Sequence, residues 1–508
     1  MASKSVRVPL TASYNTRVAA VNASSSTSSV AGIAVAGPAI AGATPQSSTK
    51  DSRLVNCFNE TVSDQITGDK KIYCTKRPGW ATSTTPAAGS IGTAILVWSG
   101  QGSGDKVMSA FGGTNSTLYD GTTGKGAITG KATGITETFV GATVATLAIS
   151  STDSTAWYYD NAVTVAVATK IVDGDFPGNA GFTLAGTFAH IDGFACIMTT
   201  DGKLWASDLN SVTAWTATSY GSANSFPDNG IGCIRYKQYV MCFGSQSIEF
   251  FYNAGQTPFP FQKSSTMTVK VGAVSADAIT SISDTVFWCG STPQGGLSIF
   301  KYDGAVQRIS KPEIDGILLI AGSSAITLTS VRFFGRSFVV CIVGTRTMVY
   351  CVEESAWHEW VSGTAVLWYK CTAVSIGSTM VNYSISNTST SGIVFTMNQA
   401  SLVYTDNGFA FTATPQLSLM DFGTKKRKFW DSVEVVADQE SSTSTLSILY
   451  SDDDYQTYST WGTVDLSESR PVARRLGSSR RRGWVLAHSA ATPMRIEAIE
   501  IRARIGNS

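Results

Sequence analysis

Short runs of alternating apolar and polar residues, separated by turns rich in Gly and Asp, recur along most of this chain. The stretch from Asn224 to Gly255 shows the pattern in its most compact form. Its first run, Gly230 to Phe243, and its second, Ile248 to Tyr252, are rich in β-branched and aromatic residues, and Gly244 to Ser247 separates them. Such residues favour strands, and a short connection containing Gly favours a hairpin. The stretch therefore predicts a strand, a turn and a returning strand.

Asp-Gly and Asn-Gly pairs punctuate the chain from Ala94 to Phe411, and such pairs supply the positive φ angles that two-residue hairpins require. They occur at Asp120-Gly121, Asp173-Gly174, Asp192-Gly193, Asp201-Gly202, Asn229-Gly230, Asp303-Gly304, Asp315-Gly316 and Asn407-Gly408. Aromatic residues recur at intervals of roughly 40 to 55 residues, the length of a four-stranded propeller blade. These markers are Tyr119, Trp157, Tyr158, Trp205, Phe250, Phe251, Tyr302, Tyr350 and Tyr404. We therefore predict an all-β protein whose body is a β-propeller.

Six blades are the favoured number for this propeller, although the spacing of the aromatic markers also allows seven. A ring of blades buries every inner face, whereas a single blade cannot bury both of its faces. We expect no helix longer than about two turns. An array of β-sandwiches is the competing interpretation, because the repeats carry neither a Trp-Asp nor a kelch signature.

Residues 1–50 differ from the rest of the chain and form the first of three predicted regions. After a short β-prone segment from Met1 to Arg17, the chain from Ala19 to Lys50 consists almost wholly of Ala, Ser, Gly, Thr and Val. Such a composition cannot build a core alone. We predict an extended N-terminal arm, which is either flexible or ordered as a strand by a neighbouring subunit.

A hairpin opens the second region, the propeller at residues 51–411. Apolar positions alternate from Asp51 to Trp80 around a turn at Gly68-Asp69. The run ends in Lys76-Arg77-Pro78-Gly79-Trp80, where Pro and Gly together force a turn beside the Trp.

The third region, residues 412–508, is predicted to be a β-sandwich-like domain. Alternating Val433, Val435 and Val436 followed by Thr445 to Tyr450 predict a strand pair, and Met494 to Ile505 predicts a closing strand. Between them lies a turn close to the Asp-box motif, Ser-x-Asp-x-Gly-x-Thr-Trp. In that motif the Asp caps the turn and the aromatic residue packs beneath it, so the motif predicts structure rather than catalysis. The matching residues are Ser451, Asp453, Tyr455 in place of Gly, Thr457, and Tyr458 in place of Trp.

Composition sets limits on partners and on the cellular compartment. Only 15% of the residues are charged and the net charge is +1, which argues against a surface wholly committed to nucleic acid or anionic membrane. The nine cysteines contain no CxxC pair and lie mostly in apolar runs, so we interpret them as core residues of a protein in a reducing compartment. We expect neither a signal peptide nor a membrane-spanning segment, and synthesis in the cytoplasm.

The sequence offers no metal, cofactor or catalytic set. His190, His358 and His488 are the only histidines, and none shares an element with a second ligand at HxH or HExxH spacing. The Gly-rich run before Ala132 fails as a phosphate loop, because this Ala replaces the hydroxyl that would hold magnesium. The Asp-box-like turn leaves a sialidase-like propeller glycosidase as an alternative, yet no spacing selects a nucleophile. We predict that the protein is not an enzyme and needs no cofactor.

Two basic clusters are the remaining candidates for a surface that faces a partner. Guanidinium and ammonium groups bind DNA phosphates and acidic protein surfaces, and the clusters predict one of these contacts. The competing interpretation is a solvated face, because acidic residues lie nearby in the sequence. The basic residues are Lys425, Lys426, Arg427, Lys428, Arg470, Arg474, Arg475, Arg480, Arg481 and Arg482.

Three separated stretches carry a family resemblance in the same order along the chain. The first contains Arg53-Leu54-Val55-Asn56-Cys57 and Arg77-Pro78-Gly79. The second, Asp228 to Gly255, contains Asp-x-Gly-Ile, a basic-aromatic turn, Cys-Phe-Gly-Ser and Ser-Ile-Glu-Phe-Phe. The third, Ser451 to Ile505, contains the Asp-box-like turn, the Arg-rich segment and the closing strand. Together they resemble the tail-hub, or packaged-DNA stabilization, proteins of short-tailed (podovirus-like) bacteriophages.

The resemblance implies a structural virion protein of the phage tail with a β-propeller body. It implies a homohexamer below the portal and its adaptor (head-to-tail connector) ring, which retains packaged DNA and forms part of the nozzle for DNA ejection. Transient contact with exiting DNA is expected, and a tail fibre, spike or needle protein is a further possible partner. The alternatives are a carbohydrate-binding or sialidase-like propeller of the tail, and a secreted adhesin, for which we see no export signal.

Overall fold

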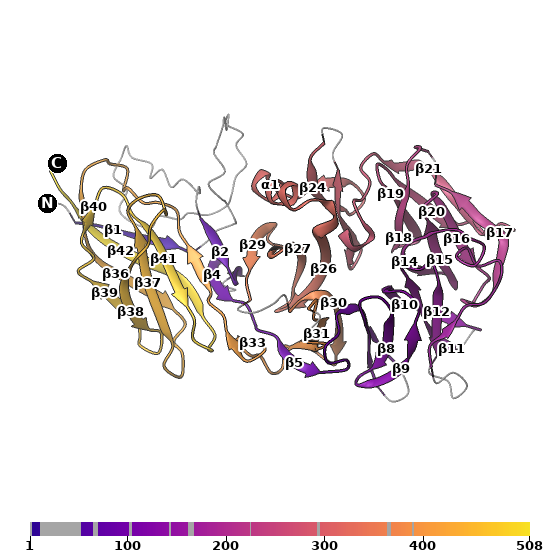
Figure 1. Ribbon diagram of the computed structural model, residues 1–508. Helices are drawn as coiled ribbons and strands as arrows, with labels where there is room; N and C mark the ends of the chain where they lie inside the picture. Colours follow the sequence, from indigo (N-terminus) through magenta and orange to yellow (C-terminus); the bar gives the residue numbers. More distant parts are fainter. Residues whose placement is uncertain are drawn as a thin grey trace. The chain divides into compact units, whose positions relative to one another are not determined.

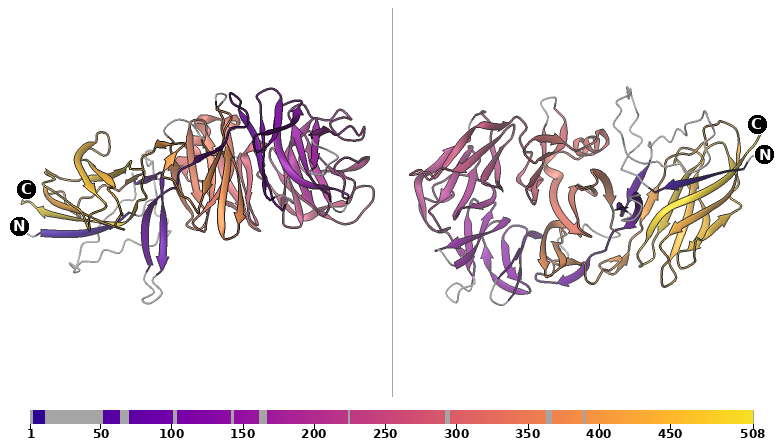
Figure 2. Two further views of the ribbon diagram at one scale, coloured as in Figure 1. Left: turned by 90° about the horizontal axis from the view of Figure 1, so that it is seen from below. Right: turned by 180° about the vertical axis from the view of Figure 1, so that it is seen from behind.

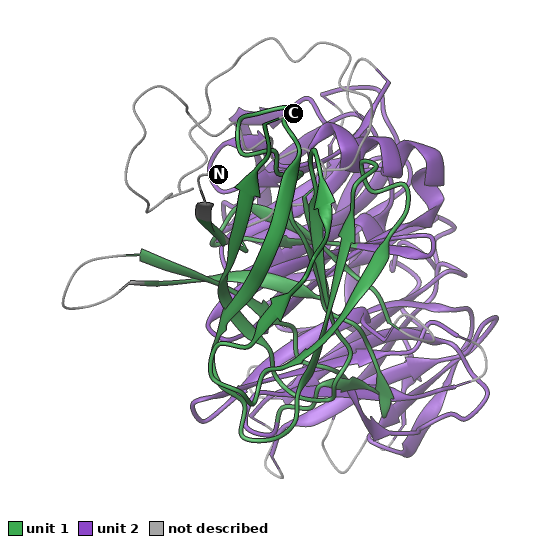
Figure 3. Ribbon diagram, turned by 90° about the vertical axis from the view of Figure 1, so that its left-hand side faces the viewer, with its two compact units in different colours: residues 1–80, 348–363, 402–508 green, residues 81–347, 364–401 purple. Residues whose placement is uncertain are grey.

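The structure is a computed structural model of the chain, and it divides into two compact units (Figure 3). Unit 1 comprises residues 1–80, 348–363 and 402–508, and unit 2 comprises residues 81–347 and 364–401. Strands dominate both units (Figure 1). The structure describes residues 3–10, 52–63, 70–100, 104–141, 144–160, 167–223, 225–291, 295–362, 367–388 and 391–507.

Six four-stranded antiparallel sheets form the blades of a β-propeller in unit 2 (Figures 1 and 2). The first blade contains β6 (Gly92–Trp98), β7 (Lys106–Phe111), β8 (Ser116–Asp120) and β9 (Thr123–Ile128), and the second contains β10 (Ala132–Val140), β11 (Val144–Ser151), β12 (Ala156–Asp160) and β13 (Thr169–Lys170). The third contains β14 (Leu184–Ile191), β15 (Phe194–Thr199), β16 (Lys203–Ser207) and β17 (Trp215–Ser222), and the fourth contains β18 (Gly230–Tyr236), β19 (Tyr239–Gly244), β20 (Ile248–Asn253) and β21 (Phe261–Val269). The fifth contains β22 (Ile279–Ile282), β23 (Thr285–Ser291), β24 (Leu297–Tyr302) and β25 (Val306–Arg308), and the sixth contains β30 (Tyr369–Ile376), β31 (Thr379–Ile385), β32 (Val394–Asn398) and β5 (Ala81–Thr84).

The first strand of each blade lies on the inside of a closed ring. Contacts run from β6 through β10 and β14 to β18, and from β22 through β26 and β30 back to β6. Between β18 and β22, the contact is made by η1 (Ala276–Ala278), which directly precedes β22. The antiparallel pair β26 (Ile326–Phe333) and β27 (Arg336–Val343) occupies one further ring position between the fifth and sixth blades. Strand β28 (Arg346–Cys351) continues the chain from it across the boundary of the two units. The predicted propeller with six blades is confirmed, and the β26–β27 pair is the additional position that the aromatic markers also allowed.

Strand β5 closes the ring with the start of the unit-2 sequence. It pairs with β32 and is the fourth strand of the sixth blade, whose other three strands come from the end of the unit-2 sequence. Strand β5 is the outermost strand of this blade, and its pairing with β32 joins the first and last parts of the unit-2 sequence in one sheet.

Apolar side chains fill the spaces between neighbouring blades. One core cluster joins the first and second blades through Trp98, Leu147 and Tyr159, and another joins the fourth and fifth blades through Phe243 and Trp288. All nine cysteines are free thiols, and eight of them are buried, as their apolar sequence context predicts. Burial is the physical cause that raises the pKa of Cys233 and of Cys289 to about 12.

Two local expectations for unit 2 are wrong. The run from Gly230 to Phe243 is two strands, because Lys237 adopts a φ of 52° and turns the chain so that Tyr236 pairs with Tyr239. The turn lacks the Gly or Asn that marks such turns in a sequence.

The second wrong expectation concerns helices, because α1 (Pro312–Ala321) spans ten residues. Pro312 at its first position and the acidic Glu313 and Asp315 in its first turn favour this start, so Asp315-Gly316 lies inside a helix rather than in a hairpin. Two short 3₁₀ segments, η1 (Ala276–Ala278) and η2 (Ser323–Ala325), complete unit 2. By contrast, Asp120-Gly121, Asp192-Gly193, Asp201-Gly202 and Asp303-Gly304 do join paired strands.

Unit 1 is a sandwich of two sheets. The first sheet has the order β3 (Cys57–Ser63), β4 (Lys70–Lys76), β42 (Arg495–Ile505), β36 (Lys428–Ala437) and β39 (Val472–Arg474), with β1 (Ser3–Pro9) paired to β42 and β40 (Ser478–Ser479) paired to β36. The second has the order β29 (Ala356–Trp360), β2 (Arg53–Val55), β35 (Thr414–Gln416), β41 (Gly483–His488), β37 (Thr445–Ser451) and β38 (Ser459–Asp465). A small hairpin of β33 (Thr405–Asp406) and β34 (Phe409–Ala410) turns at Asn407-Gly408.

One apolar core lies between the two sheets. Trp430, Val433 and Ile501 from the first sheet pack with Leu446 and Trp484 from the second. The two strands predicted as a pair, β36 and β37, therefore exist but lie in opposite sheets, where each buries one apolar face in the same core.

The opening hairpin and the arm also differ in place from the expectation. Strands β3 and β4 pair as predicted, with Cys57 opposite Lys76, but β4 then pairs with the closing strand β42 instead of joining a blade. Residues 3–9 of the predicted arm form β1 in the same sheet, whereas residues 11–51 lie outside the described part of the chain. The division into independent regions at residues 50 and 411 stays a prediction.

Candidate functional site

The structure brings the two predicted basic clusters together along one strand of unit 1. Lys428 at the start of β36 pairs with Ser479 of β40, and Trp430 pairs through its backbone with Gly477. The chain from 474 to 481 therefore runs back along the start of β36. We call the exposed residues gathered here the basic edge: Lys425, Lys426, Arg427, Arg474, Arg475, Arg480 and Arg481.

The basic edge is only partly neutralised. Arg481 forms an ion pair with Asp454 at 2.6 Å, and Arg427 donates a hydrogen bond to Ser478 at 3.1 Å. Within the described residues, Lys425, Lys426, Arg475 and Arg480 form no ion pair with a carboxylate. These side chains are free to bind phosphates or an acidic surface.

Three residues of the predicted clusters do not belong to this exposed edge. Arg470 forms ion pairs with Glu434 and Glu500, at 2.6 and 3.1 Å. Lys428 is buried, its Nζ donates to the carbonyl oxygens of Thr424 and Arg480, and burial lowers its pKa.

Arg482, the third of these residues, is a core residue. Its guanidinium binds both oxygens of Asp452 at 2.7 Å, lies 3.9 Å from the ring centre of Tyr450, and is 2% exposed. Like Lys428, it lies in the interior of the sandwich and is not available to a partner.

The Asp-box-like turn has the capping contacts that its sequence suggests. Asp453 accepts hydrogen bonds from the backbone N–H of Gln456 and Thr457, and from the hydroxyls of Ser451 and Thr457 at 2.8 and 2.5 Å. The hydrogen bonds from Thr457 are the main cause that holds the pKa of Asp453 at about 2. This carboxylate is thus occupied by its own turn.

Tyr455 takes the Gly position of the motif with a φ of 62°. Its buried ring packs against Gly483, and its hydroxyl donates to the backbone oxygen of Leu417. A side chain at Gly483 would collide with this ring, because an added Cβ would lie 2.2 Å from it. Tyr455 is thus buried in the sandwich, whereas Asp452, Asp453, Gln456, Thr457 and Tyr458 of the same turn are exposed.

A buried polar cluster around Arg77 is a feature that the sequence analysis missed. Arg77 binds both oxygens of Asp406, at 2.5 and 3.0 Å, and donates to Asn56 Oδ1 at 2.9 Å. Asn56, at a φ of 55°, also accepts from the backbone N–H of Val361 and donates to the carbonyl of Thr412. The Arg-x-x-Asn-Cys and Arg-Pro-Gly motifs therefore meet in space. Both motifs resemble the same protein family, and this common resemblance was the sequence signal that could have pointed to the contact.

Beside Arg77, a second buried network links Lys76 to His488. Lys76 Nζ donates to Ala490 O at 2.7 Å and lies 3.5 Å from His488 Nδ1, while His488 Nε2 lies 2.8 Å from the Ser444 hydroxyl. Burial, and then the charge of Arg77, lowers the pKa of Lys76 to about 8. Burial, and then the charge of Lys76, lowers the pKa of His488 to about 4. Although Ser, His and Lys are in contact here, all three are buried, so no substrate reaches them.

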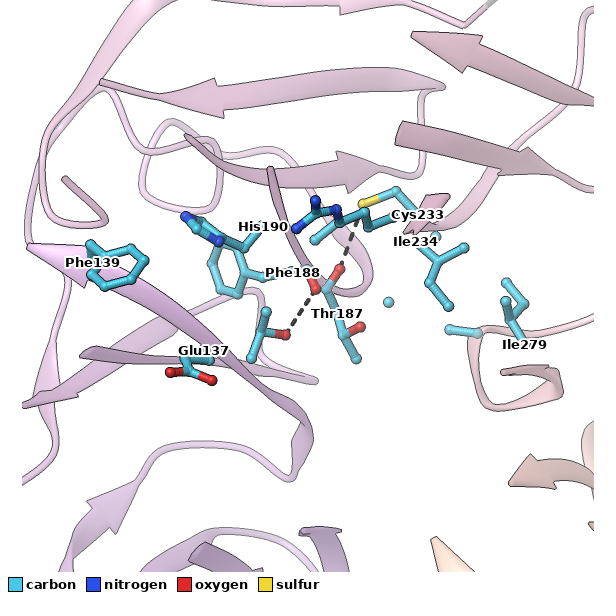
Figure 4. A pocket seen from close by; sticks show the side chains of 14 residues that line it. Glu137, Phe139, Thr187, Phe188, His190, Cys233, Ile234 and Ile279 are labelled. Carbon is cyan, nitrogen blue, oxygen red and sulfur yellow. Dashed lines mark hydrogen bonds between the residues drawn. The ribbon is translucent and has the colours of Figure 1, made fainter. Parts of the chain in front are cut away.

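A pocket of about 560 Å³ opens among the inner strands of the propeller (Figure 4). Glu137 and Phe139 of β10, His190 of β14, and Arg235 of β18 line it. Burial raises the pKa of Glu137, and burial followed by the charge of Arg235 lowers the pKa of His190. The lining contains one carboxylate and no tyrosine, so the pocket does not offer the residue set of a sialidase or of a two-carboxylate glycosidase.

A lysine side chain links three elements across the interior of the propeller. Lys370 of β30 forms an ion pair with Asp277 of η1 at 2.8 Å and donates to the Thr133 carbonyl of β10 at 3.0 Å. These three elements are not neighbours in the ring, so the contacts bridge its interior. No group of three His, Cys, Asp or Glu side chains among the described residues is placed to hold a metal ion.

The propeller region also decides the family. A sequence model of a protein family described as "Bacteriophage P22 Gp10, beta-propeller" matches residues 106–375, which is more than half of the chain. The chain belongs to this family. It is therefore a member of a family of phage virion proteins that stabilise DNA, and the predicted resemblance is confirmed. The matched range includes the pocket and Val361 of the Arg77 cluster, but it excludes Asn56, Arg77, Asp406 and the basic edge.

Other comparisons add little to the family assignment. No curated protein matches the sequence. Among solved structures, the chain is similar to one described as "Crystal structure of BBS1N in complex with ARL6DN, soaked with lead". The two share 11% identity over 63% of this chain and 97% of that chain, with a TM-score of 0.38, and this level of similarity carries no argument about function. No helix among the described residues has the length and apolar character needed to cross a bilayer.

Proposed function

We propose that this protein forms a homohexameric tail hub below the portal and its adaptor ring, where it retains the packaged DNA and forms part of the ejection nozzle. Membership of the phage DNA-stabilisation family carries the proposal. In this role the protein acts by assembly rather than by catalysis. The propeller supplies a rigid body, and identical copies close into a ring through heterologous contacts.

The basic edge supplies the surface that this role requires. Its free cations, at Lys425, Lys426, Arg475 and Arg480, are carried by two segments that meet at the start of β36, although the whole chain carries a net charge of only +1. A concentrated patch on a nearly neutral protein directs one face toward an anionic partner and leaves the rest of the surface neutral. We assign this face to the phosphates of the exiting DNA.

Stoichiometry with the portal complex is the first test of the hub. Native mass spectrometry or light scattering of the purified protein, alone and mixed with portal and adaptor rings, measures it directly. We expect six copies per portal complex. A chain that never joins portal rings, under conditions where the adaptor does, would overturn the proposal.

Charge reversal tests the assignment of the basic edge. We expect K425E/K426E to weaken binding of double-stranded DNA and to lower the dependence of the binding constant on salt, because fewer counterions are released. The matched control is K70E/K71E, which makes the same charge change at two exposed lysines of β4. Equal losses in both variants would show that net charge, and not the basic edge, governs the interaction. Unchanged DNA binding with weakened adaptor binding would assign the edge to an acidic protein surface.

A further inference from the structure

Strand β1 completes one edge of the first sheet of unit 1, although it comes from the far N-terminus. Its seven residues pair with β42 in continuous antiparallel register, from Ser3 opposite Arg504 to Pro9 opposite Ala498 (Figure 1). Val8 packs against the sandwich core, and Leu10, which is 1% exposed, is part of that core. Arg7 adds an ion pair with Glu497 at 2.5 Å. The strand is thus an integral part of the sheet.

The sequence between β1 and the rest of unit 1 is far longer than this position requires. Forty-one residues, 11–51, separate Leu10 from Ser52. Leu10 and Leu54 nevertheless belong to the same apolar core, so both ends of this segment lie in one sandwich. A chain of 41 residues can span up to about 140 Å, whereas the eleven-residue β42, the longest strand of the sandwich, is about 37 Å long.

We propose that in the assembled ring β1 pairs with β42 of a neighbouring copy of this chain, so that the N-terminal strands are exchanged around the ring. The pairing surface is the one described above, and the partner is a second copy, because an identical strand makes identical contacts with β42 in either chain. Exchange of an identical element is a low-cost route to assembly. The excess of connecting sequence gives the reach that exchange needs, and it has no use for pairing within one chain, where it only adds to the entropy cost of closing the loop.

The exchange explains how separate copies would be held together without a large new interface. Each copy donates seven residues of strand with a buried Leu10 and accepts the same elements from its other neighbour. Such a head-to-tail exchange is heterologous and closes when the ring closes. This inference rests on the ring proposed above, and it adds the contact that links the copies.

Two variants, each with one cysteine added to the nine native thiols, test the exchange directly. Arg7 and Glu500 are opposite each other in the β1–β42 register. One preparation carries R7C and the other carries E500C, and the two are denatured together, refolded, assembled and oxidised. A disulfide between these positions forms only between copies in such a mixture. We expect a linked dimer on a non-reducing gel, which is absent from either variant alone.

The double variant R7C/E500C distinguishes pairing of β1 with β42 within one chain from pairing between chains. In the assembled ring we expect a ladder of linked chains up to the full ring. The control is S432C/R502C, whose positions are opposite each other on β36 and β42 and whose disulfide is expected within one chain. A ring in which the R7C/E500C disulfides all lie within single chains would overturn the exchange and leave the hub standing. A wild-type chain that stays monomeric with portal complex would overturn the hub and the exchange together.

Discussion

The two units of this protein bury different kinds of side chain. Every buried Lys and Arg side chain among the described residues lies in unit 1, namely Lys76, Arg77, Lys428 and Arg482. The propeller instead packs repeated apolar faces, with Trp98 and Trp288 among its largest fully buried side chains. Unit 1 therefore contains the buried cations, and unit 2 contains the repeating apolar layers.

The difference follows from how each unit is assembled. Consecutive strands build each blade of the propeller, so apolar alternation and tight turns are sufficient to direct pairing. Unit 1 joins three distant segments of sequence, and many pairings of its strands would bury a similar apolar area. A buried cation is costly without its own partner, so Arg77 is satisfied only when residues 56, 361 and 406 are all in place.

Breaking the Arg77 cluster is expected to have the largest effect. R77M leaves Asp406 buried without its cation, which should lower the free energy of unfolding of unit 1 by about 3–5 kcal/mol. Urea unfolding followed by a probe within unit 1 measures this. R481M removes an exposed ion pair and is the control, with an expected change of about 0.5 kcal/mol or less. Similar effects of the two substitutions would contradict a special role for the buried pair.

Acid should destabilise unit 1 through His488. Its pKa is about 4 in the folded protein and 6.5 for an unperturbed side chain, so the unfolded state binds more protons between these values. The contribution of the neutral His488 to the free energy of unfolding is fully present above pH 6.5. It is lost as the pH falls toward 4, by roughly 3 kcal/mol. Unfolding free energies measured from pH 7 to pH 4 should show this slope, and H488Q should remove that part of it. An unchanged slope in H488Q would assign the acid sensitivity to other groups.

The same acid transition should expose thiols of unit 1 before those of unit 2. Cys57 and Cys74 lie in the sandwich core, whereas Cys233 and Cys242 lie between blades of the propeller. Near pH 4.5, dithiodipyridine followed by mass spectrometry of peptides should label Cys57 and Cys74 first. Simultaneous labelling of all four thiols would show that the two units unfold together, which would contradict a lower stability of unit 1 in acid.

The smallest effect is expected at the basic edge. K425E/K426E changes two exposed side chains without ion pairs, so the free energy of unfolding should change by about 0.5 kcal/mol or less. Thermal unfolding of this variant beside the wild type tests the expectation. A large loss of stability would mean that the edge is structural, and any loss of DNA binding by the variant would then have to be attributed to unfolding.

The sequence by itself determined the elements that depend on neighbours along the chain. The blades follow from alternating residues and from Asp-Gly turns such as Asp192-Gly193, and the Asp-box-like turn follows from Ser451, Asp453 and Thr457 within seven residues. Hydrogen bonds and turn angles of this kind are local, so composition and spacing predict them.

Only the tertiary structure decided which distant segments meet. It placed β36 and β37 in opposite sheets, moved the opening hairpin to β42, and separated the buried Lys428 and Arg482 from the exposed residues of the same clusters. It also joined Arg77 to Asp406, which the sequence shows only as the residue before the Asn407-Gly408 turn. A basic side chain looks the same in a sequence whether a carboxylate 329 residues away neutralises it or water does, because burial and pairing are properties of the folded chain.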